Sequence, residues 1–232
     1  MKRSFTTAFF SMLTAASLLS ACKKDPVTIP DYTFVSVTNA SPSSATYNIY
    51  FDANKLINGA LPYEGNIAYK QINPTTYTVK LTPESSSENK LSKQFSFDAN
   101  KGYSLFIIGR AGKTEGTDKF DILQVEDELK APATDKALIR FINLSPDAPA
   151  LNLHEKGKDA IISDKAYKSV SAFVEVEARK YIFDLKDKAS NLSKAEMAEV
   201  DIKKGGIYTI IAKGLLTPAE SEKPFGGFVV AN

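Results

Sequence analysis

The chain has 232 residues, with 29 basic and 27 acidic side chains, one histidine, one cysteine and no tryptophan. Because basic and acidic side chains are nearly equal in number, we expect no basic surface for nucleic acid and exclude nucleic acid as a partner. One histidine and one cysteine are too few for a zinc site, so we expect neither a metal nor a cofactor.

Residues 1–21 have the pattern of a secretory signal peptide. Lys2 and Arg3 precede an apolar run at residues 8–19, which is followed by small side chains. The run is shorter than the about 20 apolar residues that a membrane-spanning helix needs. We therefore expect the segment to be removed, which leaves equal numbers of basic and acidic side chains.

Residues 19–22, with the sequence LSAC, resemble the lipobox of bacterial lipoproteins. The resemblance implies that the Cys22 thiol receives a diacylglyceryl group, that cleavage makes Cys22 the first residue, and that its amine is acylated with a fatty acid such as palmitate. Several acyl chains give stable membrane anchoring where one would be marginal. Cys22 is then a lipid attachment point, neither a nucleophile nor half of a disulfide. The alternative is an ordinary signal peptide with an incidental cysteine.

Residues 22–31 form a short polar tether, in which Lys23 follows the cysteine. Lipoproteins retained at an inner membrane often carry Asp at this position. The resemblance therefore places the protein in the cell envelope, at the outer membrane of a Gram-negative bacterium. Because the chain has no second cysteine, we expect hydrophobic cores to stabilise the fold without disulfides.

The rest of the chain contains an internal repeat. Residues 35–42 (VSVTNASP) align with residues 139–146 (IRFINLSP) at an offset of 104, and after one inserted residue Tyr103 aligns with Tyr208. This register predicts two domains of ordinary size, at residues 32–128 and 137–232. Residues 129–136 are the expected linker, and its short length predicts domains stacked end to end.

Each copy has the pattern of a β-sandwich. Apolar side chains alternate with polar ones at residues 76–81, and residues 103–108 and 207–212 are near-continuous apolar runs. These patterns are typical of half-buried and central strands, respectively. About seven strands per copy, separated by turn-forming residues, predict two tandem Ig-like β-sandwiches. Residues 193–200 contain good helix formers, but the repeat register favours a strand at their end.

Residues 139–152 (IRFINLSPDAPALN) resemble the opening motif of a bacterial family, domain of unknown function 4397 (DUF4397). Residues 180–185 and 207–212 are similar to its later tyrosine-bearing strands. The first copy departs from the motif, with SSA at residues 43–45 where the second has DAP. The similarity covers most of residues 32–232. It implies secreted or lipid-anchored Ig-like domains of unassigned function, and it supplies no catalytic residues.

Asn143, Ser145 and Tyr181 have structural interpretations in this pattern. Asn143 and Ser145 can hold the opening turn through hydrogen bonds to local backbone. Tyr181 and its equivalent Tyr77 begin strands, where the ring can enter the core while the hydroxyl reaches loop backbone.

Three features that suggest chemistry also have structural interpretations. His154 alternates with two leucines, which predicts the outer face of a strand. Residues 109–114 (GRAGKT) resemble a phosphate-binding loop, but Ile107 stands where that motif requires glycine, so we expect a hairpin connection. Glu175 and Glu177 alternate with valines on a solvated face, where neither is kept protonated.

We therefore expect a membrane-anchored, non-catalytic envelope lipoprotein, held by the lipid on Cys22. Its sandwiches would bind a protein or a glycan or serve a structural role. Tyrosines at positions 50, 63 and 69 keep glycan binding open in a chain without tryptophan. The alternative is an envelope hydrolase using a carboxylate pair or a Ser–Lys pair, which a perturbed carboxylate or lysine in a deep pocket would favour.

Overall fold

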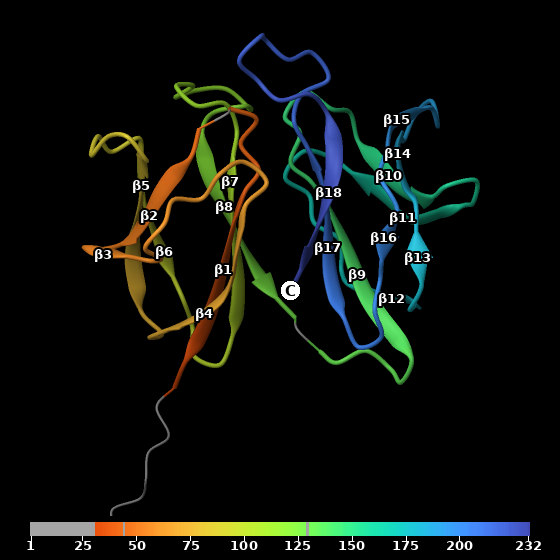
Figure 1. The fold of residues 1–232 in the computed structure, drawn as a ribbon, viewed down its shortest axis with the longest axis horizontal. Coiled ribbons are helices and arrows are strands. Elements are labelled where there is room, and N and C mark those ends of the chain that lie inside the picture. The colour runs from red at the N-terminus through yellow and green to blue at the C-terminus, as the bar shows by residue number, and fades with distance from the viewer. Residues whose placement is uncertain (1–30, 44, 129) are drawn as a thin grey trace, which may run out of the picture. The chain divides into compact units, whose positions relative to one another are not determined.

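The computed structural model describes residues 31–43, 45–128 and 130–232. Every regular element in these ranges is a β-strand, so the protein is all-β, as predicted (Figure 1). The predicted signal peptide, the lipidation site at Cys22 and all but the last residue of the tether lie outside the described residues. The described part contains no helix long and apolar enough to cross a membrane.

The first half of the described chain forms two four-stranded sheets. In one sheet β1 runs parallel to β7, and the strand order is β4 (Asn66–Ile72), β1 (Thr33–Asn39), β7 (Gly102–Ile108), β8 (Asp121–Asp127). The other sheet has the order β3 (Asn54–Lys55), β2 (Tyr47–Phe51), β5 (Thr76–Pro83), β6 (Leu91–Ser96). Side chains from both sheets, including Val35, Ile49 and Leu105, form one hydrophobic cluster. The two sheets therefore make a sandwich, called the first sandwich below.

The second half repeats this order. One sheet contains β12 (Val174–Glu177), β9 (Lys136–Asn143), β17 (Ile207–Lys213) and β18 (Gly226–Ala231), with β9 parallel to β17. The other contains β11 (Ala160–Lys165), β10 (Leu151–Glu155), β14 (Phe183–Asp187) and β15 (Ser193–Glu196), and β13 (Lys180–Tyr181) pairs with β16 (Val200–Asp201). Residues 193–201 thus hold strands, as the repeat register predicted. A separate cluster including Ile139, Leu153 and Ile210 fills this second sandwich.

The opening turns of the two sandwiches are held by equivalent hydrogen bonds. The Asn39 side-chain amide donates to the carbonyls of Ala45 and Leu61, at 3.1 and 3.3 Å. One repeat later, Asn143 donates to the carbonyls of residues 149 and 165, both at 3.1 Å. It also accepts from the Ser145 N–H at 3.1 Å. The predicted turn-holding role of Asn143 is therefore confirmed.

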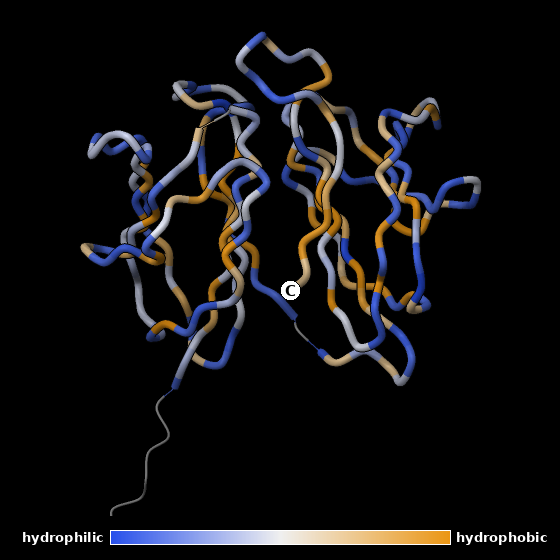
Figure 2. Tube along the Cα trace, viewed as in Figure 1, coloured by the Kyte–Doolittle hydropathy of each residue, from blue (hydrophilic) through white to orange (hydrophobic). Residues whose placement is uncertain are grey.

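The sandwiches contact each other through outer sheet faces. Phe106 on β7 and Ile211 on β17 are buried in a third hydrophobic cluster, which also contains Val230 of β18. Both β7 and β17 carry apolar side chains on both faces, and these runs show as hydrophobic segments in Figure 2. A strand that is apolar on both faces must be covered on both sides. The packing is therefore face to face, and the expected end-to-end stacking is wrong.

Candidate functional site

A buried ion pair lies between the two sandwiches. Arg140 on β9 is 2% exposed, and its Nη1 donates to Oδ1 of the buried Asp127, at the end of β8, at 2.5 Å. The Arg140 Nη2 donates to the Ser104 hydroxyl at 3.1 Å, and that hydroxyl donates to Asp127 Oδ2 at 2.7 Å. Each charged group is thus both paired and hydrogen-bonded, as burial of a charge requires.

Further hydrogen bonds close this ion pair into a ring. Arg140 Nε donates to the Thr209 hydroxyl at 2.9 Å, which donates to Asn232 Oδ1 at 2.7 Å. The Asn232 amide donates to the Tyr69 hydroxyl at 3.3 Å, and Tyr69 donates to Asp127 Oδ2 at 2.5 Å. Burial, and then the Asp127 charge, raise the pKa of Tyr69 to about 12, so the phenol remains a donor at neutral pH. The carboxylate has three donors, and the ring joins the sandwiches.

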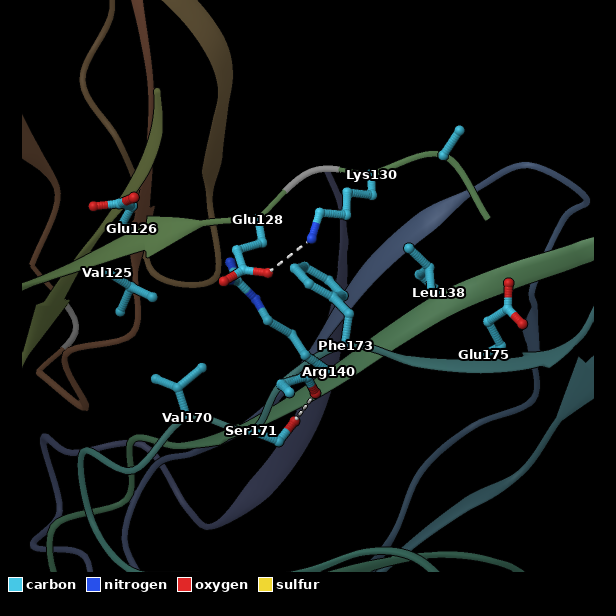
Figure 3. A pocket seen from close by; sticks show the side chains of 12 residues that line it. Val125, Glu126, Glu128, Lys130, Leu138, Arg140, Val170, Ser171, Phe173 and Glu175 are labelled. Atoms are coloured by element: carbon cyan, nitrogen blue, oxygen red, sulfur yellow. Dashed lines mark hydrogen bonds and ion pairs between the residues drawn. The ribbon is translucent and has the colours of Figure 1, made fainter. Parts of the chain in front are cut away.

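A cavity of about 540 Å³ opens beside this ring (Figure 3). Leu138 and Phe173 line it together with other apolar side chains, and the charged lining residues are Glu126, Glu128, Lys130, Arg140 and Glu175. The Arg140 guanidinium carbon lies 4.8 Å from the centre of the Phe173 ring. Figure 3 shows the two side chains together, beside the contact between Glu128 and Lys130. The volume lies within the range of small-molecule pockets, and charged and apolar side chains both contribute to the lining.

His154 lies beside the core of the second sandwich. Leu151 and Leu153 of the same strand belong to the core cluster, so alternation along β10 directs the His154 side chain to the opposite, outer face, as predicted. The side chain is nevertheless only 6% exposed, and its Nδ1 is 2.9 Å from the Lys158 carbonyl oxygen in the β10–β11 turn. Among the residues that the structure describes, no three His, Cys, Asp or Glu side chains gather as a metal site.

The paired glutamates and the glycine-rich loop have structural roles. Glu175 and Glu177 are exposed, as expected for a solvated strand face. Glu175 accepts the Ala133 N–H at 2.7 Å and so holds the connection between the sandwiches, while Glu177 pairs with Lys136. Residues 109–114 lie in the connection between the antiparallel β7 and β8, which confirms the predicted hairpin.

The three tyrosines proposed for glycan contact do not share one exposed surface. Tyr69 belongs to the buried ring, and the Tyr63 hydroxyl is also buried. Lys213 and Lys223 of the second sandwich lie over the Tyr63 ring, at 5.4 and 5.9 Å from its centre. Both tyrosines therefore stabilise the contact between sandwiches. The sequence pattern did not indicate this contact, although Arg140 is the one charged residue within the apolar run 137–142.

Comparisons with known proteins give a family and distant structural likenesses, among them the following two. The TIE protein of Bacillus anthracis is 13% identical with a TM-score of 0.25, over 79% of this chain and 34% of its own, so this chain spans about a third of it. CBMbc (family CBM26) from Eubacterium rectale Amy13K, solved in complex with maltoheptaose, is 11% identical with a TM-score of 0.26, over 83% of this chain and 100% of its own. Likenesses this low carry no functional argument, and no curated protein matches the chain.

The family model matches a continuous stretch of the described fold. The model described as Domain of unknown function (DUF4397) aligns with residues 33–154. That stretch contains β1 to β8 of the first sandwich and continues through β9 into β10. Because the match covers just over half of the residues, this chain belongs to the DUF4397 family.

Proposed function

We propose that this protein is a lipid-anchored, non-catalytic binding protein of the bacterial cell envelope. The observation that carries the proposal is the LSAC sequence at residues 19–22, which precedes a short polar tether and the first sandwich. The tether ends at residue 31, two residues before β1 begins at Thr33. A lipid on Cys22 would thus hold the sandwiches close to the membrane surface, and Lys23 favours the outer membrane.

The second sandwich is, on this proposal, another copy of the family domain. Its strand order repeats that of the first sandwich. Asn39 and Asn143, one repeat apart, bond the carbonyls of equivalent residues. Duplication of an Ig-like module supports a role in binding or in building a surface, because such modules present loops at their ends.

The buried polar groups support a non-catalytic role. A general acid or base must exchange a proton with substrate, yet Asp127 is held by Arg140, Ser104 and Tyr69. Glu175 and Glu177 are exposed on a strand and bond neighbouring backbone or lysine. These carboxylates therefore have structural partners, and the proposal assigns no residue to a reaction.

Fatty-acid labelling of Cys22→Ser tests the proposal. The full chain would be expressed in a Gram-negative host with an alkyne-labelled palmitate, followed by separation of membranes from soluble protein. We expect the wild type to carry label and sediment with outer membranes. The Ser variant should lose the label and become soluble, because its hydroxyl does not take the diacylglyceryl group. A labelled Ser variant, or an unlabelled wild type, would contradict lipid anchoring.

A further inference from the structure

A second cavity, of about 730 Å³, lies at one end of the first sandwich. The β5–β6 connection, residues 84–90, and the β7–β8 connection, residues 109–120, contribute to its walls. The aromatic residues Tyr47 and Phe120 also line it, with ring centres 5.3 Å apart. Its charged lining residues are Glu88, Lys90, Lys93, Lys113, Lys119 and Asp121.

The lysines of this cavity outnumber their acidic partners. Lys93 pairs with Asp121 at 2.9 Å, and Lys90 pairs with Glu88 at 2.7 Å. Lys113 is exposed, and only Asp118, 3.7 Å away, offsets its charge. That carboxylate also lies 3.7 Å from Arg110. Lys119 is exposed and has no acidic partner within the described ranges. The cavity thus presents surplus positive charge to solvent.

The repeat shows that these lysines are not required by the fold. Positions 113 and 119 correspond to Pro218 and Pro224 in the second sandwich, while Phe120 corresponds to Phe225. Both connections begin with a glycine of similar φ, +74° at Gly109 and +75° at Gly214. The backbone and aromatic positions are therefore shared, and the lysines belong to the first sandwich alone.

The β7–β8 and β17–β18 connections are held by different side chains, because the two repeats differ at the equivalent positions 43 and 147. In the second sandwich the Asp147 carboxylate accepts the N–H groups of Leu216 and Thr217, at 2.9 and 3.0 Å, and the Thr217 hydroxyl at 3.1 Å. Ser43 occupies the equivalent position in the first sandwich, and its hydroxyl accepts the Ala111 N–H at 2.8 Å. The backbone of residues 111 and 112 therefore has no carboxylate equivalent to Asp147 beside it, and Lys113 is held through backbone hydrogen bonds to Arg110 and Phe120. Residues 112–114 line the cavity.

The cavity lies at the end of the sandwich opposite to the start of β1. The tether joins at the start of β1, whereas the cavity includes the connection that follows the end of β7, which is parallel to β1. β1 has 7 residues, and at about 3.3 Å per residue it separates the two ends by roughly 20 Å. A protein anchored through Cys22 would present this cavity away from its attachment point.

We propose that this cavity binds an anionic sugar. Lys113 and Lys119 would pair with its carboxylate or phosphate as charge-assisted hydrogen-bond donors. Asn89, Ser92 and Thr114, which also line the cavity, supply donors and acceptors for hydroxyl groups. This assignment rests on the proposed binding function, whereas lipid attachment is tested separately by labelling.

Calorimetric titration of the mature chain, residues 22–232 with Cys22→Ser, tests the assignment. The probes are trigalacturonate, glucose 6-phosphate, the neutral sugar maltotriose and inorganic phosphate. We expect at least one anionic sugar to bind. The sugar that binds identifies carboxylate or phosphate as the recognised group. Maltotriose and inorganic phosphate should bind at least about tenfold more weakly. Maltotriose lacks the anionic group, and inorganic phosphate lacks the sugar hydroxyl groups.

The variant Lys113→Gln/Lys119→Gln should bind the anionic sugar about tenfold more weakly, because two charge-assisted contacts are lost. Its matched control is Lys156→Gln/Lys180→Gln, which removes the same charge from exposed positions of the second sandwich. Thermal melts would show that both variants are folded. Failure of both anionic sugars to bind the wild type would overturn the assignment. So would equal binding of maltotriose or phosphate, or equal losses in the two variants.

Discussion

At the residue scale, Tyr181 has the predicted role. It is 4% exposed within the core of the second sandwich, and its hydroxyl donates to the Glu177 carbonyl at 2.9 Å. Its ring stacks on Phe183 with centres 5.3 Å apart. The equivalent Tyr77 is only partly buried and packs edge-on against neighbouring phenylalanines. The same position is thus more completely covered in the second sandwich.

Two substitutions of Tyr181 should therefore distinguish the contribution of its ring to stability from that of its hydroxyl. We expect Tyr181→Ala to lower the free energy of unfolding by about 3 kcal/mol, the scale for truncating a buried aromatic side chain. Tyr181→Phe should cost about 1 kcal/mol, for one hydrogen bond. Urea unfolding of the mature chain measures both. If Tyr181→Ala has the wild-type midpoint, the ring does not stabilise the core.

At the scale of elements, the connections between strands are where the repeats differ most. Asp147 ties the β17–β18 connection to the opening turn through two N–H groups and a hydroxyl. Burial alone would raise the pKa of this carboxyl, but the bonds from Leu216 and Thr217 outweigh burial and lower it. The ionised form therefore stabilises the turn.

Replacing Asp147 with the residue of the first repeat tests this element. We expect Asp147→Ser to cost about 1–2 kcal/mol near neutral pH, because two or more hydrogen bonds are lost. Since the folded pKa lies below the unfolded value of 3.8, the wild-type advantage is complete above that pH and declines as the pH falls below it. Urea melts at neutral and acidic pH measure the difference. The exposed Asp159→Ser is the control, and a loss as large there would contradict the role of Asp147.

At the scale of the whole molecule, equivalent positions of the two sandwiches meet at their interface. Asp127 corresponds to Asn232 and Ser104 to Thr209, and all four belong to the buried hydrogen-bonded ring. Contact between equivalent surfaces is the arrangement of a two-fold symmetric dimer. Here both halves belong to one chain, and the ion pair with Arg140 makes the two contributions unequal.

The ion pair should therefore show strong coupling between its partners. We expect Asp127→Asn or Arg140→Ser alone to cost about 3–5 kcal/mol, because each leaves a buried charge unpaired. The double variant carries the residues found at the equivalent positions of the other repeat, Asn232 and Ser36. It should lose less free energy of unfolding than the sum of the two single variants. A double-mutant cycle by urea unfolding measures the coupling. Additive losses would show that the two groups do not stabilise each other.

The strands, the repeat and the turn-holding asparagine could be predicted from the order of residues alone. Alternation at residues 76–81 and the apolar run at 103–108 depend on local periodicity, and β5 and β7 follow them. The position of Asn143 within its turn involves backbone only a few residues away, apart from the carbonyl of Lys165. Such signals are readable because the period of a strand is set by its own backbone.

Which segment covers each apolar strand face is decided by the tertiary structure. The outer faces of β7 and β17 cover each other, and the partners of Arg140 lie 13, 36 and 69 residues away along the chain. His154 was assigned to the correct face, yet the turn at Lys158 buries it. Periodicity shows that a face is apolar or polar, but it does not identify the segment that packs on it. That choice is made by contacts between distant residues, which the compact fold alone brings together.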